Sequence, residues 1–405
     1  MLFKRIGGIF LFIRWFLSLC VYVFFLWLNL TVDFYSPIIY FTTFILFTAL
    51  AFFVALVRIR GRLKNEKEKA MGALPLSHYH LVVSTVFKNE GETVVHTVKE
   101  YLSFNNPPML VFYDDHSDDD SYDSLKAIEA ENTQHFIIKR LERSKKILHP
   151  KGMGFEDLIN KHDGDYYMIL DADTLVKEEE VEKALHIMKQ NDYKVLHFTR
   201  RNDLSDDLAN HIGDTEEISS SINQVLGIFP WYFNGSGFII RADAAKQMTY
   251  DAYSPSDDSQ IGLFLRKNNI MVFDTLSLFA HEKAPKTIGK LMKQHSSWTK
   301  GGIHHYLEKE RFTIFPPAFV SAYMLIALFN PLQLYNILLP VAFLFLFGID
   351  FISNKIVADR AIGLSIRNAF CHALVFFFKG TFITAYHIFT FPFKRFSFWF
   401  SKTQY

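Results

Sequence analysis

Four long apolar segments place the strongest constraint on what this chain can fold into. Two lie near the N-terminus, at 9–30 and 34–57, and two near the C-terminus, at 315–349 and 368–393. About 20 predominantly apolar residues are enough to cross a bilayer as a helix. Half of all residues are hydrophobic and 43 are Phe, which is rich for a soluble protein. The sequence therefore predicts membrane segments on both sides of a central domain.

Basic residues beside the first two segments predict their orientation. Lys4 and Arg5 precede the first segment, the connector 31–33 contains no Lys or Arg, and the basic run 58–69 follows the second. Lys and Arg accumulate on the cytoplasmic side of membrane helices, so both flanks are predicted to be cytoplasmic. The first segment lacks a small-residue cleavage site, which indicates an anchor and not a signal peptide.

The C-terminal apolar region allows two arrangements. The segment 315–349 is too long for one span and is interrupted at 330–331 by Asn-Pro, while 368–393 contains Lys379, which is costly inside a bilayer. Two spans, or an interfacial helix with one span, both fit. We predict two transmembrane helices in 1–60, a cytoplasmic domain in 75–312, and transmembrane or interfacial helices in 313–405.

Charge and cysteine content exclude several functions. The formal net charge is +1, which gives no bias toward nucleic acid or another polyanion. The two cysteines, Cys20 and Cys371, both lie in apolar stretches, so neither a disulfide framework nor a zinc site is expected.

Strand-like and helix-like patterns alternate through the central domain. Such alternation predicts an α/β fold with a parallel sheet, whose ligands bind beyond the carboxyl ends of the strands. The expected strands lie near 79–87, 108–115, 134–142 and 165–174, and the expected helices at 92–102, 121–131 and 177–191. Three strand ends carry polar clusters, namely Asn89-Glu90, Asp114-Asp115 and Asp171-Ala172-Asp173. We expect these clusters to form one site.

The pair Asp171 and Asp173 closes an apolar run, "YYMIL", that reads as a buried strand. Two carboxylates at that place repel each other and are costly to desolvate, so a cation is the expected compensation. A hard divalent ion prefers carboxylate oxygens and keeps positions open for phosphate. The alternative without a metal is a solvated helix N-terminus, where carboxylates are favourable. We expect this alternative to hold for Asp118-Asp119-Asp120.

Two later motifs give the pair its context. The stretch 253–269 places Asp257-Asp258 at the start of an amphipathic helix, and 281–302 contains Gln294, Trp298 and a Gly pair before the next apolar segment. Taken in order with the earlier clusters, they resemble the membrane-embedded family 2 glycosyltransferases of the hyaluronan-, chitin- and poly-N-acetylglucosamine-synthase kind. The resemblance implies an α/β domain of the GT-A type that binds a nucleotide sugar.

The resemblance also implies residue roles in this chain. The stretch "STVFKNE" would border the nucleotide, "YDDHSDD" would read uracil, and "HPKGMGFEDLIN" would approach the diphosphate. The Asp-x-Asp would hold Mn²⁺ or Mg²⁺, with Asp173 the stronger ligand candidate, and "SDD" would supply the base. The implied residues are Thr85, Glu90, Asp114, Asp115, Lys151, Asp171 and Asp173, with Asp258 as catalytic base.

The motif nearest the C-terminal segments departs from the family pattern. "QHSSW" stands where the family has Gln-x-x-Arg-Trp, so Ser297 replaces an Arg that would help neutralise the leaving diphosphate. Gln294 and Trp298 remain, and residues four apart share one helix face. Lys293, His295 or Lys300 are candidates to replace the missing charge.

The implied reaction is inverting, metal-dependent transfer from a UDP-sugar at the cytoplasmic face, with the plasma membrane as the expected location. The predicted outcome is processive synthesis and extrusion of a polysaccharide. The alternative is single transfer to a lipid of the ceramide, diacylglycerol or polyprenyl phosphate type. A third hypothesis is a non-enzymatic membrane scaffold or an inactive homologue that binds nucleotide. Two further residues have simpler interpretations that involve no catalytic or binding role. Arg241 in "NGSGFIIRADA" would be a surface residue, and His281 would be a structural histidine.

Overall fold

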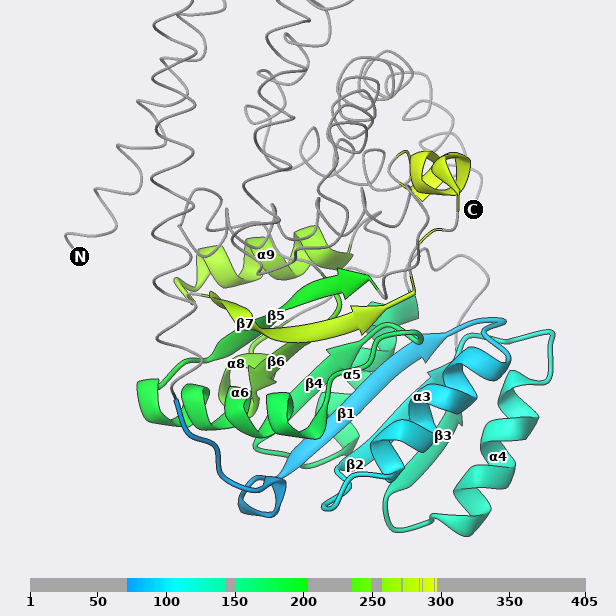
Figure 1. The fold of residues 1–405 in the computed structure, drawn as a ribbon, viewed down its shortest axis with the longest axis horizontal. Coiled ribbons are helices and arrows are strands. Elements are labelled where there is room, and N and C mark those ends of the chain that lie inside the picture. The colour runs from blue at the N-terminus through cyan, green and yellow to red at the C-terminus, as the bar shows by residue number, and fades with distance from the viewer. Residues whose placement is uncertain are drawn as a thin grey trace, which may run out of the picture. The chain divides into compact units, whose positions relative to one another are not determined.

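The computed structural model describes most of the central part of the chain (Figure 1). The described residues are 71–142, 150–202, 235–248, 257–270, 272–283, 285, 287–294 and 296. The chain divides into two units, one formed by 57–288 with 354–362 and the other by 1–56, 289–353 and 363–405. Nearly all described residues belong to the first unit. The second contributes 289–294 and 296, the larger part of a short helix at 288–294.

The four apolar segments lie outside the described residues. Among the residues that are described, no helix is both long and apolar enough to cross a membrane. The boundaries at 60, 75 and 312 therefore stay predictions.

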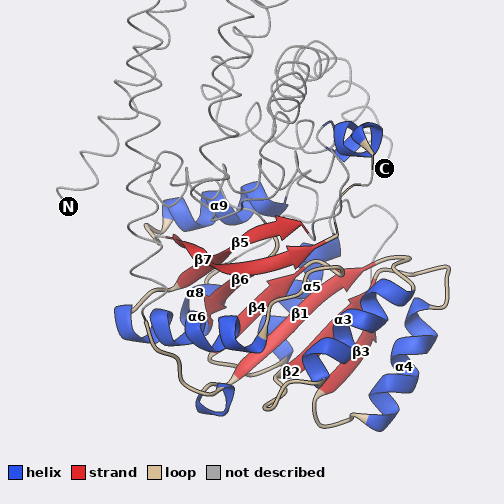
Figure 2. Cartoon of the chain, in the orientation of Figure 1, coloured by secondary structure: helices blue, strands red, loops and turns tan. Residues whose placement is uncertain are grey.

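A seven-stranded sheet forms the centre of the first unit (Figure 2), in the order β3-β2-β1-β4-β6-β5-β7. Strands β1 to β5 and β7 all run in one direction, whereas β6 is antiparallel to both neighbours, β4 and β5. The strands are β1 (Leu81–Phe87), β2 (Met109–Asp114), β3 (Phe136–Arg140), β4 (Tyr166–Leu170), β5 (Val195–Asn202), β6 (Phe238–Arg241) and β7 (Val272–Glu282). The carboxyl ends of six strands thus meet the start of β6 at one edge.

Helices cover both faces of this sheet. On one face are α3 (Glu92–Leu102), α4 (Ser121–Glu131) and α6 (Glu178–Asn191), and on the other are α5 (Pro150–Lys161), α8 (Ala242–Ala245) and α9 (Asp257–Lys267) (Figure 1). A 3₁₀ turn, η1 (Leu76–His78), precedes β1. Successive strand residues alternate between the two cores, as Val82 and Val83 show, because side chains of a strand point to opposite faces in turn.

The sequence predicted much of this arrangement. The helices expected at 92–102 and 121–131 have those bounds in the structure, and the four expected strands are present. The prediction of a parallel sheet holds for β1 to β4 and is wrong for β6. This strand begins at the edge where β4 ends, so it must run back along β4, and the sheet is mixed.

Gly154 allows α5 to lie close to the sheet. A Cβ atom built on Gly154 would lie 2.4 Å from Val86 Cγ2 and 3.3 Å from Tyr113 Cδ2. Such a separation is far below van der Waals contact, so the helix would have to move away from β1 and β2. Since Lys151 lies one turn earlier in α5, this close approach also positions Lys151.

We predict that Gly154→Ala lowers the free energy of unfolding by about 1–3 kcal/mol, as overpacking of a tight core does. The sign of this change distinguishes a packed site from an open one, because Gly→Ala in an open helix position stabilises the protein by up to about 1 kcal/mol. Unfolding curves of the purified full chain would measure the change. Gly289→Ala, in the short helix 288–294, is the matched control, since a Cβ there has no neighbour within 4 Å. Adding Val86→Ala should recover much of the loss, and a Gly154→Ala variant as stable as wild type would contradict the packing argument.

The first turn of α6 contains three glutamates with different surroundings. Glu178 accepts hydrogen bonds from the backbone amides of Asn105 and Asn106 and holds that loop against the helix. Glu180 lies deeper, and burial raises its pKa to about 7, although backbone amides of Phe279 and Lys177 partly oppose the shift. The folded chain therefore holds a proton on Glu180 more tightly than the unfolded chain does.

We predict that this proton makes stability depend on pH. Since the folded-state pKa of Glu180 is raised, the free energy of unfolding falls as pH rises from about 4.5 to about 7 and then levels off. Glu180→Gln keeps the acceptor oxygen and removes the charge, so it should gain about 1–3 kcal/mol on wild type above pH 7 and nothing near pH 4.5. Thermal unfolding of both proteins between pH 4.5 and 8 would measure the difference. A stability difference between Glu180→Gln and wild type that does not change with pH would contradict the raised pKa of Glu180.

Candidate functional site

The edge at which the parallel strands end gathers charged residues from five strands. Arg140 ends β3, Asp114 ends β2, Asp171 directly follows β4, and Glu282 ends β7, while Arg200 lies two residues before the end of β5. Ligands of open α/β sheets bind outside this edge. The three clusters expected from the sequence follow strands β1, β2 and β4, which are parallel, so they lie at this same edge. That they form one site stays a prediction.

The turn 171–176, which contains both aspartates of the Asp-x-Asp, is held by helix α3 on one side. Thr97 Oγ1 donates a hydrogen bond of 2.7 Å to the carbonyl of Ala172. Tyr101 Oη accepts one of 2.9 Å from the amide of Val176. Both side chains are buried, so water does not compete with these bonds. This part of the turn has one strongly preferred backbone path.

Strand β7 holds the same turn from another side. Leu175 and His281 exchange two backbone hydrogen bonds, of 2.8 and 2.7 Å, and form an isolated antiparallel bridge. The backbone of His281 thereby has a structural role, in agreement with its interpretation as a structural histidine.

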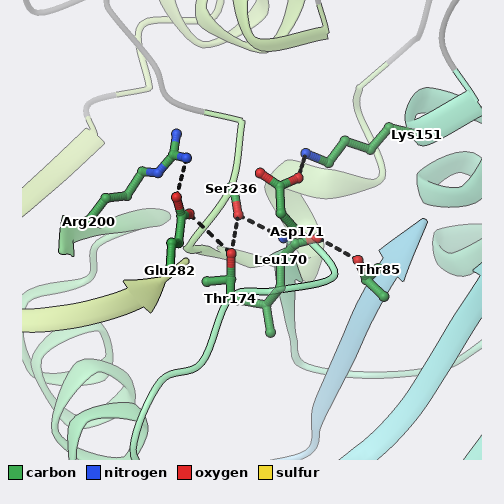
Figure 3. Close-up of polar contacts among 8 residues, drawn as sticks. All are labelled: Thr85, Lys151, Leu170, Asp171, Thr174, Arg200, Ser236 and Glu282. Atoms are coloured by element: carbon green, nitrogen blue, oxygen red, sulfur yellow. Dashed lines mark hydrogen bonds and ion pairs between the residues drawn. The ribbon is translucent and has the colours of Figure 1, made fainter. Parts of the chain in front are cut away.

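Four polar side chains connect Asp171 to the far strands of the sheet (Figure 3). The amide of Asp171 donates to Ser236 Oγ at 2.7 Å, Ser236 Oγ lies 3.1 Å from Thr174 Oγ1, and Thr174 Oγ1 donates to Glu282 Oε1 at 3.1 Å. The other oxygen of Glu282 forms an ion pair with Arg200 Nη2. The described residues thus form one continuous network from β5 and β7 to the start of the turn.

Ser236 reaches this position because Gly237 bends the chain. Gly237 has φ +69°, a left-handed conformation that Gly adopts without strain. Its amide donates to the carbonyl of Ile169 at 3.0 Å, which ties the turn before β6 to the end of β4. The "NGSG" stretch thus supports the Asp-x-Asp turn through Ser236.

Asp171 lies between two cations. Its carboxylate forms an ion pair with Lys151 of α5, and 39% of the side chain is exposed. Burial alone would raise its pKa, but the positive charges of Lys151 and Arg200 hold the pKa below the ordinary value. Asp171 is therefore ionised at neutral pH and already has a partner.

Asp173 has a different environment. Burial and the negative charges of Glu282 and Asp171 raise its pKa to about 6. The pKa of Glu90 is also raised by burial and by Asp173 and Asp171, with Lys283 opposing the shift. Burial and the charges of Glu282 and Asp171 thus disfavour the charged form of Asp173, an arrangement that added positive charge would relieve.

The chemistry of this group fits a hard divalent ion. Among the described residues, no set of three or more His, Cys, Asp or Glu side chains is arranged to hold a metal by itself. Magnesium sites for nucleotide substrates commonly use one or two carboxylates and complete the coordination with phosphate and water. Asp173 is suited to that role because it carries unrelieved negative charge, whereas one oxygen of Asp171 already binds Lys151.

The loops after β1 and β2 are tied together beside this group. The amide of Asn89 donates to Ser117 Oγ at 2.9 Å and Asn89 Oδ1 accepts from the amide of Asp118 at 2.7 Å. Asp119 accepts hydrogen bonds from the amide and hydroxyl of Ser121 at the start of α4, which is the loop and cap role expected for the acidic run.

Asp114 and Asp115, the predicted uracil readers, lie beneath these loops. The side chain of Asp114 is fully buried, accepting from Arg140 Nε at 2.9 Å and from the amide of Ser117 at 2.9 Å. The Arg140 guanidinium also stacks over Tyr122, 4.1 Å from the ring centre. Asp115 is 5% exposed. Contact of either aspartate with a nucleotide base stays a prediction.

Thr85 also lies below the surface. It is 1% exposed, and its hydroxyl donates to the carbonyl of Leu170 at 2.8 Å. This bond joins the end of β1 to the residue before Asp171 (Figure 3). The structure therefore gives Thr85 a supporting position, while Glu90 is exposed near the two aspartates.

Three of the predicted residues cannot be added to this group. The backbone of Asp258 lies in the first turn of α9, but its side chain is outside the described part of the structure. Gln294 belongs to the second unit, and Trp298 is outside the described residues. Their roles stay predictions.

Arg241 lies at the opposite edge of the sheet. It pairs with Tyr166, the first residue of β4, and its guanidinium bonds to Asp243 and Asp192. Those two bonds raise the pKa of Arg241 further above its ordinary value. Arg241 is thus partly exposed and held by ion pairs with its neighbours, in agreement with its interpretation as a surface residue.

Sequence reasoning missed the roles of Ser236, Thr174, Arg200 and Glu282. Ser236 and Glu282 lie in stretches that were singled out for other residues, "NGSG" and "HEK". Arg200 lies in β5, a strand that was not expected, and only its place near a strand end would have marked it. These residues become neighbours through strand order, which a single sequence does not show.

Comparison with known proteins identifies the family. A model described as glycosyl transferase family group 2 matches residues 166–393, which is more than half of the chain, and one described as glycosyl transferase family 2 matches 82–248. No curated protein matches the chain significantly.

Solved structures resemble it at low identity. The mannosyltransferase PcManGT from Pyrobaculum calidifontis, in complex with GDP-Man and Mn²⁺, is 14% identical with a TM-score of 0.48, over 85% of this chain and 95% of that one. Residues 1–349 of S. aureus TarS, in complex with UDP-GlcNAc, are 13% identical with a TM-score of 0.36, over 69% and 90%. These likenesses are too distant to carry the assignment, which rests on the family models. By those matches the chain belongs to glycosyl transferase family group 2 and is a glycosyltransferase.

Proposed function

We propose that this protein transfers a sugar from a UDP-sugar to an acceptor at the cytoplasmic face of the plasma membrane, inverts the anomeric configuration and requires Mn²⁺ or Mg²⁺. The proposed product is a polysaccharide that the same chain extends and extrudes. The observation that carries the proposal is the Asp171-Ala172-Asp173 turn, held rigidly at the carboxyl edge of the sheet between Lys151 and Arg200.

The charges at this edge support a diphosphate donor. Lys151 lies against Asp171, and Lys283 donates a hydrogen bond to Thr93 at 2.8 Å near Glu90. Lysines near Asp171 and Glu90 suit a ligand that carries negative phosphates together with a divalent ion. That ion, held by Asp173, would neutralise charge on the departing diphosphate as a Lewis acid.

The proposed chemistry needs no covalent intermediate. Asp258 takes the proton from the acceptor hydroxyl as that oxygen attacks the anomeric carbon, and UDP leaves from the opposite side. Trp298 packs under the acceptor sugar, and Gln294 lies beside the departing UDP. Lys151 orients Asp171 and contributes positive charge beside the diphosphate, where fixed charges stabilise the developing negative charge.

The first test follows UDP release and product size. Purified full-length protein in detergent or lipid is supplied with Mn²⁺ or Mg²⁺ and a panel of UDP-sugars, with GDP-mannose for comparison. We expect metal-dependent UDP release and a polymer that lengthens with time. A product of one sugar on an extractable lipid would replace the polymer proposal with single transfer to lipid. Absence of metal-dependent release from every donor would contradict the proposed function.

The second test addresses the base. Asp258→Asn should lower the transfer rate by about 100-fold or more, as loss of a general base does, while binding of UDP stays near the wild-type level. Asp257→Asn, one residue earlier in α9, is the matched control and should retain most activity. Normal turnover by Asp258→Asn would remove Asp258 from the role of base.

A further inference from the structure

A buried ion pair without an assigned role lies beside the Asp-x-Asp turn. Arg200 of β5 and Glu282 of β7 pair with 12% and 8% of their side chains exposed. The two strands are parallel neighbours, and β7 is the last strand in the order of the described sheet. Removing such charges from water costs several kcal/mol per ion, and their attraction often does no more than offset that cost. Stability alone therefore explains this pair poorly.

The connections of the pair point toward the site. Glu282 Oε2 binds Arg200, and Glu282 Oε1 accepts the hydroxyl hydrogen of Thr174 at 3.1 Å. Thr174 is fully buried and its amide also donates to the carbonyl of Asp171 at 3.1 Å. Thr174 Oγ1 and Ser236 Oγ are 3.1 Å apart, and Ser236 accepts the amide of Asp171. Both peptide groups of Asp171 are thus connected to the pair through Thr174.

The position of the pair also balances charge. Figure 3 shows Lys151 and Arg200 approaching from opposite sides, with Asp171 between them. Lys151 belongs to α5, which packs on one face of the sheet, whereas Arg200 comes from within the sheet itself. Loss of Arg200 would leave Glu282 buried without its cation, close to two further carboxylates.

We propose that Arg200 and Glu282 are positioning residues of the donor site, which act through Thr174 and Ser236 to keep the turn of Asp171 and Asp173 in its metal-binding geometry. The inference rests on the proposed function, because it assigns the pair to the site for the metal and the nucleotide. Partners of this kind, one step removed from a metal ligand, commonly change metal affinity or activity 10–100-fold when mutated.

The test measures metal binding directly as well as nucleotide binding. Free Mn²⁺ is titrated with the purified full chain by electron paramagnetic resonance, and fluorescent UDP is titrated at a series of Mn²⁺ concentrations. Glu282→Gln and Thr174→Val should each raise the Mn²⁺ concentration for half-maximal binding about tenfold or more. Circular dichroism and a cooperative thermal transition show that each variant is folded, since Glu282→Gln leaves Arg200 buried without its partner and lowers the midpoint of unfolding. Thr174→Ser restores the hydroxyl and should recover most of the affinity.

Matched controls separate positioning from general damage. Asp192→Asn breaks the Arg241 ion pair at the opposite edge of the sheet and should leave Mn²⁺ binding at the wild-type level. Wild-type Mn²⁺ affinity in folded Glu282→Gln and Thr174→Val would overturn the inference and leave the proposed function intact. A wild-type protein that binds neither Mn²⁺ nor UDP would overturn both.

Discussion

Repulsion among carboxylates is the constraint on which the site depends. Asp171, Asp173 and Glu282 lie close enough for their charges to affect one another, and such a cluster would be unstable without compensation. Lys151 and Arg200 supply it from different elements. Helix α5 must approach the sheet closely to bring Lys151 near, and Gly154 is what permits that approach. A packing requirement on one face of the sheet thus determines an electrostatic balance at its edge.

The turn after β4 is rigid because three elements hold it. Thr97 and Tyr101 contact it from α3, Ser236 from the turn before β6, and His281 from β7. Each of these contacts is a hydrogen bond to the backbone of the turn or from it, so the path of the chain itself is determined. Preorganised geometry of this kind lets fixed charges act without reorganisation.

The resemblance inferred from motifs and the family matches agree on the class of enzyme, and the structure refines the roles of individual residues. Thr85 and Asp114 both lie at predicted positions, yet each uses its polar atoms within the fold. Sequence motifs mark a position and not the direction in which a side chain points. Glu282 is the opposite case. No role was predicted for it from the sequence, although it follows His281, and in the structure it bonds to both Thr174 and Arg200.

The sequence by itself determined the alternation of strands and helices, the edge at which charged residues gather, and the Asp-x-Asp with its neighbours, because hydrophobic period and strand ends are local properties. Only the tertiary structure decided that β6 runs back between β4 and β5 and that β5 and β7 lie beyond it. That order brings Arg200, Ser236 and Glu282 to the turn of Asp171. Residues far apart in sequence are joined there by long-range pairing, and the energy of such contacts depends on the whole sheet and not on any one segment.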